Sequence, residues 1–152
     1  MKILLPVDGS ADALAAVRHA LALVRDGLQA EFVLVNVQEP ASLYEMVVAH
    51  DPDVIVHVRS EAGADLLSPA EALLEAAGLS YESEVAGGQP VTVLVELLEN
   101  YGCDAVVMGA RGAGSGGGSV AMAMLQRSPV PVTLVRAPGA DESAPGGDAA
   151  EG

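Results

Sequence analysis

Short apolar runs and amphipathic stretches alternate along this chain. The runs at 3–7, 32–37, 105–108 and 130–135 predict strands, and the second and third have the apolar density typical of strands covered on both faces. Residues 81–85 alternate Tyr, Ser and Val with two glutamates, which predicts a strand with one polar face near the edge of a sheet.

Helical spacing fills the intervals between these strands. Apolar residues recur every three or four positions after the first turn, at Leu14, Val17, Leu21, Val24 and Leu28. Ser10 is the predicted N-cap of this helix, and Asp12 lies favourably in its first turn. Further helices are predicted from Pro52 to about residue 77, from residue 90 to a Gly102 C-cap, and from Ser119 to about residue 126. Pro69 leaves open whether the second helix is one kinked helix or two short ones.

This alternation predicts an α/β fold, an open parallel sheet with right-handed crossovers. Sheets of this kind bind ligands beyond the carboxyl ends of their strands, where the strand order reverses. Two segments occupy such positions: Pro6-Val7-Asp8 after the first strand and Met108-Gly109 after the fourth.

Composition narrows the class of protein. The chain is 51% hydrophobic but only 3% aromatic, so its core consists mainly of Val, Leu, Ile and Ala. A net charge of −14 argues against binding to nucleic acid or to an anionic membrane. The N-terminal apolar run is too short for a signal peptide, and no apolar stretch is long enough for a membrane span, so we expect a cytoplasmic protein. We expect one domain over 1–138 and a disordered acidic tail over 139–152.

The segment from Gly109 to Gly118 contains six glycines in ten residues and precedes a helix start. Such a loop allows close backbone approach to a phosphate, the helix N-terminus offers N–H groups, and Arg111 adds a cationic side chain. A flexible connection with Ser119 as a simple N-cap explains the same pattern. The segment is neither a Walker A loop nor a GxGxxG dinucleotide motif.

Other candidate residues are less specific. The Asp8 carboxylate could accept hydrogen bonds from a ribose or organise its own turn. His19, His50 and His57 lack metal-binding spacing: we expect His19 on a helix surface, His57 on the second helix and His50 in a solvated loop. Cys103 has no partner for a disulfide or a CxxC motif and is predicted to be a structural thiol.

Three stretches resemble a known family. They are the opening KILLPVDGS, the YGCDAVVMGARG that begins at Tyr101, and GSVA from Gly118 followed by SPVPVTLV from Ser128. Over about residues 1–137 the chain resembles a universal stress protein domain of the UspA superfamily. The resemblance implies a Rossmann-like, adenine nucleotide alpha hydrolase-like sheet of order 3-2-1-4-5 with helices on both faces. It also implies a homodimer paired through the last strand, and in nucleotide-binding members ATP at the switch point.

The resemblance also implies roles for individual residues. Asp8 matches the ribose-side carboxylate, and Val37 matches the backbone contact to adenine. Met108, Gly109 and Gly112 would line the phosphates, with Gly118, Ser119 and Val120 closing the loop. Together with the segments considered above, the predicted binding residues are Pro6, Asp8, Val37, Met108, Gly109, Arg111, Gly112, Gly118, Ser119 and Val120.

One departure from the family pattern divides the functional hypotheses. Nucleotide-binding members have nine residues between the second and third glycines of the loop, whereas Gly112 and Gly118 enclose only residues 113–117. The first hypothesis is a dimeric stress-response or signalling protein that binds ATP, with Mg²⁺, and hydrolyses it slowly at most. The second is a nucleotide-free dimeric interaction module, which the shortened loop favours.

Overall fold

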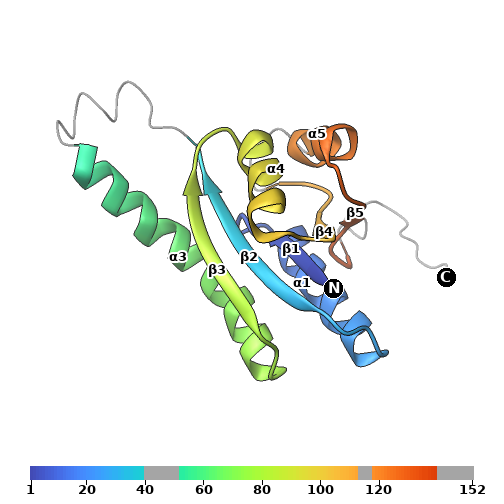
Figure 1. The fold of residues 1–152 in the computed structure, drawn as a ribbon. Coiled ribbons are helices and arrows are strands. Elements are labelled where there is room, and N and C mark those ends of the chain that lie inside the picture. Colours follow the sequence, from blue (N-terminus) through green and yellow to red (C-terminus); the bar gives the residue numbers. More distant parts are fainter. Residues whose placement is uncertain (40–51, 113–117, 140–152) are drawn as a thin grey trace.

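The computed structural model describes residues 1–39, 52–112 and 118–139 of the chain (Figure 1). The elements in this part are β1 (Lys2–Pro6), α1 (Ala11–Arg25), β2 (Glu31–Gln38), α3 (Pro52–Ala76), β3 (Tyr81–Gly87), α4 (Pro90–Tyr101), β4 (Ala105–Gly109), α5 (Ser119–Arg127) and β5 (Val132–Val135). This order confirms the predicted alternation of strands and helices. The last strand is shorter than predicted, because residues 130 and 131 precede β5.

The strands form one parallel sheet in the order β3-β2-β1-β4-β5, as predicted. β1 lies in the middle, where Leu4 is opposite Val33 of β2 on one side and Val106 of β4 on the other. The chain therefore winds from β1 out to β3 and then crosses back to β4. This reversal puts the switch in strand order between β1 and β4.

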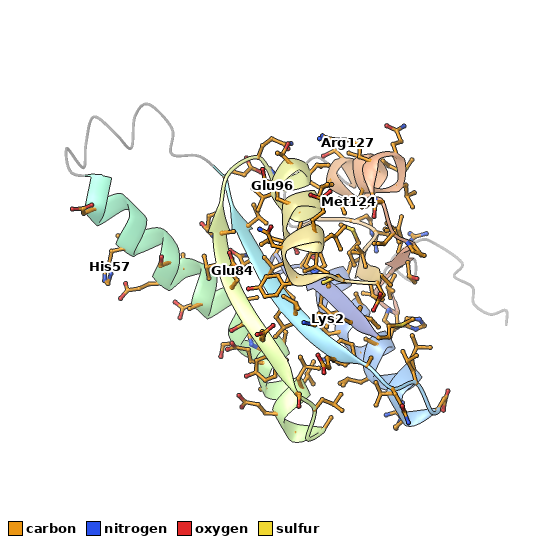
Figure 2. All side chains as sticks on the ribbon, viewed as in Figure 1. Lys2, His57, Glu84, Glu96, Met124 and Arg127 are labelled. Atoms are coloured by element: carbon orange, nitrogen blue, oxygen red, sulfur yellow. The ribbon has the colours of Figure 1, made fainter. Side chains whose placement is uncertain are left out.

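Each face of the sheet has its own apolar core, with α1 and α3 on one side and α4 and α5 on the other (Figure 1). Side chains alternate between the cores along a strand: Ile3 and Leu5 of β1 pack against α1 and α3, whereas Leu4 packs against α4 and α5. Burial on both faces explains the dense apolar runs in the sequence. Met124 of α5, labelled in Figure 2, is fully buried in the second of these cores.

Local signals at the helix ends agree with the sequence predictions. The Ser10 side chain caps α1 by accepting a hydrogen bond from the Ala13 N–H, at 3.1 Å. Gly102 ends α4 in the left-handed conformation, with φ 66°. The question at Pro69 is resolved, since α3 is assigned as one continuous helix that contains it.

Two tyrosines hydrogen-bond to glutamates next to the β3 edge. The Tyr81 hydroxyl donates to Glu75 of α3, and the Tyr101 hydroxyl donates to Glu84 of β3. These hydrogen bonds to carboxylates are the main reason that the pKa of each tyrosine is raised to about 12. The strand order, with β3 outermost, confirms the predicted edge position of this half-polar strand.

Within the described ranges, none of the helices is both long and apolar enough to cross a membrane. The expected acidic tail lies outside the described residues from residue 140 onward.

Candidate functional site

A cavity of about 470 Å³ opens at the carboxyl ends of β1, β2 and β4, next to the switch in strand order. Its lining includes every residue predicted for binding: Pro6, Asp8, Val37, Met108, Gly109, Arg111, Gly112, Gly118, Ser119 and Val120. The structure therefore brings the first turn, the end of β2 and both ends of the glycine loop around one space. Its volume is within the range of small-molecule sites in proteins.

The turn after β1 forms one wall of the cavity. The Ser10 N–H donates to Asp8 Oδ1 at 3.0 Å, so the carboxylate organises the turn from which α1 begins. Asp8 remains exposed and lines the cavity. The two roles considered for Asp8 are therefore compatible, because Oδ1 serves the turn while Oδ2 lies beside Gly112 at the cavity.

Apolar side chains from β2 and α4 form a second wall, where Val35 and Val37 of β2 and Pro90 and Leu94 of α4 line the cavity. Val35 and Leu94 are buried in the α4–α5 core, and Val37 packs against it. Of these four residues, only Val37 was predicted from the sequence to line the site.

Glycines allow the segment after β4 to run close to neighbouring backbone. A Cβ on Gly109 would lie 2.8 Å from the Ala13 nitrogen and 2.8 Å from the Asp12 carbonyl carbon, so this glycine is needed for packing against α1. A Cβ on Gly112 would meet only Asp8 Oδ2, at 3.1 Å. Gly109 thus has a structural role, whereas Gly112 faces the cavity beside the Asp8 carboxylate.

Of the two roles considered for Ser119, the structure does not bear out the N-cap, and α5 begins at Ser119 as predicted. Gly118 is the N-cap residue of α5, with φ 107° and no side-chain hydrogen bond, and Ser119 is the first helical residue. Only glycine adopts this φ readily, and a Cβ there would lie 2.7 Å from the Ala110 oxygen. The first turn of α5 therefore reaches the cavity without a side-chain cap, and Ser119 and Val120 line it.

The sequence predicted Asp12 only as a favourable acid in the first turn of α1, whereas the structure shows that it holds the loop beside the cavity. It is buried, at 4% exposure, and its carboxylate accepts four hydrogen bonds. Three come from Arg111, through the backbone N–H at 3.1 Å, Nε at 2.9 Å and Nη2 at 3.1 Å, and the fourth comes from the Ala137 N–H at 2.8 Å. The Arg111 guanidinium, predicted to face a phosphate, is thus paired with Asp12.

The Arg111 side-chain hydrogen bond is the main reason that the pKa of Asp12 lies below its ordinary value of 3.8, although burial acts in the opposite direction. The carboxylate is therefore charged at neutral pH. A sequence signal was present, because Asp12 falls on the same helical face as the buried Ala16 and Ala20. An acid on the buried face of a helix requires a partner.

The other candidates lie away from the cavity. His19 is exposed on α1, and His57 is exposed on α3, where its Nε2 lies 3.2 Å from Glu61 (Figure 2). Cys103 is buried, and burial raises the pKa of its thiol, consistent with a structural role. His50 is outside the described residues. Within the described ranges, no group of three or more His, Cys, Asp or Glu side chains could hold a metal ion.

The fold and the cavity together define a doubly wound α/β protein with a ligand-sized site at its switch point. The model of the universal stress protein family matches residues 1–136. The chain therefore belongs to the universal stress protein family, as its sequence motifs predict.

Individual relatives agree with this assignment. Universal stress protein MJ0531 of Methanocaldococcus jannaschii is 27% identical over 141 residues, which cover 90% of this chain and 82% of the relative. A universal stress protein solved in complex with cAMP is 25% identical, with a TM-score of 0.65 over 90% of this chain and 97% of its own. A universal stress protein family protein from Arabidopsis thaliana, solved with AMP bound, has a TM-score of 0.71 at 20% identity, over 98% of this chain and 99% of its own, and supports the fold alone.

Proposed function

We propose that this chain is a cytoplasmic, dimeric stress-response or signalling protein that binds ATP in the cavity between β1 and β4. The observation that carries the proposal is the convergence of all predicted binding residues, from three separate segments, on one cavity of about 470 Å³. The solved relative that holds cAMP supports an adenine nucleotide as the ligand class.

The adenosine part of the ligand fits the walls made by β1, β2 and α4. Val37 and Leu94 supply an apolar surface for the adenine ring, and the exposed Asp8 carboxylate lies on the cavity wall assigned to the ribose hydroxyls. Pockets for small molecules commonly combine apolar walls with a few polar groups in this way.

The phosphates fit the other end, beside Gly112, Gly118 and the start of α5. Backbone N–H groups at a helix N-terminus, with the positive end of the helix dipole, favour an anion there. The charged side chains on the cavity wall are two acids, Asp8 and Glu39, and the paired Arg111. A triphosphate therefore needs Mg²⁺ to offset its charge.

We expect at most slow hydrolysis. Residues 105–120 contain no histidine, lysine or acid that could act as a general base, and the neighbouring Asp8 carboxylate is assigned to the ribose. Binding would then act by shifting the protein between conformations or partners rather than by turnover.

The second hypothesis is a dimeric interaction module that binds no nucleotide, and the five-residue interval between Gly112 and Gly118 favours it. The two are separated by denaturing the freshly purified protein and resolving the supernatant by ion exchange, followed by calorimetry with ATP and Mg²⁺. A co-purified adenine nucleotide or a measurable heat supports the first hypothesis. A properly folded protein that gives neither a co-purified nucleotide nor a measurable heat supports the second hypothesis.

We propose that the dimer forms through β5. β5 is an edge strand, and the exposed apolar residues Met122 and Leu125 lie on the neighbouring α5. The carbonyls of Pro131 and Val135 bond toward β4, so Val132 and Leu134 direct their backbone groups outward. Pro131 therefore leaves the outer ladder usable. Light scattering at micromolar concentration should give the mass of two chains, and a monomer mass would contradict the proposal.

A further inference from the structure

Asp12 is the only buried acid among the described residues, and it does not line the cavity. Its hydrogen-bond donors lie far away in sequence, in Arg111 after β4 and in Ala137 after β5. A buried carboxylate is stabilised only where several donors surround it. This one therefore joins three segments through its own hydrogen bonds: the start of α1, the loop after β4 and the segment after β5.

The position of Arg111 gives this arrangement its significance. Arg111 lies between Gly109 and Gly112, and all three residues line the cavity. Asp12 Oδ2 accepts from both the Arg111 backbone N–H and Nε, so it fixes the main chain as well as the side chain. Ser10 Oγ, at the start of the same helix, lies 3.5 Å from the Arg111 carbonyl oxygen. The start of α1 thus holds the loop at both the N–H and the C=O of one residue.

We propose that Asp12 is a positioning residue of the nucleotide site, which fixes the backbone of residues 109–112 for phosphate binding without touching the ligand. The inference rests on the proposed function. Glycine loses more conformational freedom on ordering than any other residue, so a glycine-rich loop gains most from being ordered before the ligand binds. Asp12 orders the loop through Arg111, whose backbone N–H and guanidinium both donate to the carboxylate.

An opposing hypothesis assigns the ligand to Arg111 directly. In that case the guanidinium leaves Asp12 and pairs with a phosphate, and Asp12 is only a competitor. Removal of the Asp12 charge would then leave ATP affinity unchanged or increase it. The positioning role requires the opposite result.

The test compares Asp12→Asn with the unmodified chain. The substitution keeps the size of the side chain but replaces one acceptor oxygen with an NH₂ group facing donors. Asp104→Asn is the matched control, because Asp104 Oδ2 also accepts from a distant backbone, the Lys2 N–H at 2.8 Å, but at the amino ends of the strands. Calorimetry with ATP plus Mg²⁺ and with adenosine is combined with amide hydrogen exchange in the absence of ligand.

In Asp12→Asn we expect ATP affinity to fall roughly tenfold or more, because a hydrogen-bonded charge is lost from the loop support. Adenosine affinity should fall less than about threefold, since adenosine has no phosphate to meet residues 109–112. The amides of Arg111 and Ala137 should exchange about tenfold faster or more. Asp104→Asn should change neither the affinities nor these two amides.

The contrary outcomes are distinct. Equal losses of ATP and adenosine affinity would show a general structural role and overturn the positioning role. Unchanged or higher ATP affinity, or unchanged exchange of the Arg111 amide, would overturn it as well. Failure of the unmodified chain to bind ATP at all would instead overturn the proposed function, and the positioning role with it.

Discussion

Two turns lie side by side at the cavity, after the neighbouring strands β1 and β4, and are stabilised in different ways. The turn after β1 is organised locally, since the Ser10 N–H donates to Asp8 and the Ser10 side chain caps α1 at Ala13. The segment after β4 depends on contacts from far along the chain, because its Arg111 is held by Asp12 and its Gly109 packs against the start of α1.

The comparison shows that one short segment, the start of α1, stabilises both turns. Ser10 and Asp12 both belong to the start of α1. Ser10 supports the turn after β1, called here the near turn, and Asp12 supports the segment after β4, called here the far loop. The position of the far loop therefore depends on the start of α1. Substitutions at the start of α1 should disturb both turns, whereas substitutions in the far loop should disturb only that loop.

The largest expected effect is that of Gly109→Val. A Cβ at this position would lie 2.8 Å from backbone atoms of Ala13 and Asp12, and backbone cannot rotate out of the way. We expect a loss of about 3 kcal/mol or more in the free energy of unfolding, at the upper end for overpacked sites, measured by urea denaturation. Gly112→Ala is the control, since its Cβ would meet only a carboxylate oxygen at 3.1 Å. A similar loss in both variants would contradict the assigned close contact.

Gly112→Val tests the far loop as a phosphate site. Gly112 has no positive φ, so steric bulk rather than backbone strain is the cause of the expected effect. ATP affinity should fall about a hundredfold, equivalent to about 2.8 kcal/mol, while adenosine affinity changes little. Calorimetry with both ligands decides, and equal losses would mean that the loop is not at the phosphates.

Asp12 predicts a pH dependence of stability. Because its pKa is lower in the folded chain than the ordinary 3.8, the carboxylate stabilises the fold fully above that value. The contribution, about 1.5–3 kcal/mol for hydrogen bonds to a charged group, is lost as pH falls from 3.8 through the folded pKa. Urea denaturation should therefore show Asp12→Asn less stable than the unmodified chain at pH 7, with the gap narrowing as the pH falls below 3.8. A gap that persists undiminished at low pH would contradict this origin.

Local patterns predicted most of the fold. Apolar density identified the central strands, Gly102 identified the end of α4, and Ser10 identified the start of α1. These features depend on residues within a few positions of one another, so one sequence is enough to reveal them. The single α3 could not be decided in advance, because Pro69 and its capping pattern suit both a helix start and a helix interior.

The site was predicted only in part, for a physical reason. Residues of the cavity follow from strand order and family motifs, and all of them line one space. The partnership of Asp12 with Arg111 and Ala137 spans 99 and 125 residues, and no local pattern encodes it. The sequence left an N-cap role open for Ser119, because it does not reveal that Gly118, with φ 107°, takes that position without a side-chain hydrogen bond.

Asp8→Ala tests the near turn with a smaller effect. Removal of the carboxylate should lower ATP affinity about tenfold or more, since a hydrogen bond to a charged acceptor is worth about 1.5–3 kcal/mol. Adenosine affinity should fall by the same factor, because the ribose is common to both ligands. Loss of ATP affinity alone would move Asp8 from the ribose to the phosphate end. The fold should persist, which far-ultraviolet circular dichroism can verify.

The smallest effect is expected from ending the chain at Pro138. This truncation keeps Ala137, whose N–H donates to Asp12, and so leaves the support of the far loop intact. The removed residues, from Gly139 onward, carry no apolar side chain larger than Ala except Pro145, and ordering them would cost about 1–2 kcal/mol each with little burial in return. Thermal unfolding should give the same Tm within error for both chains. A clear decrease in Tm would show that the tail docks on the domain. A loss of ATP affinity in the truncated chain with no decrease in Tm would place the tail at the cavity.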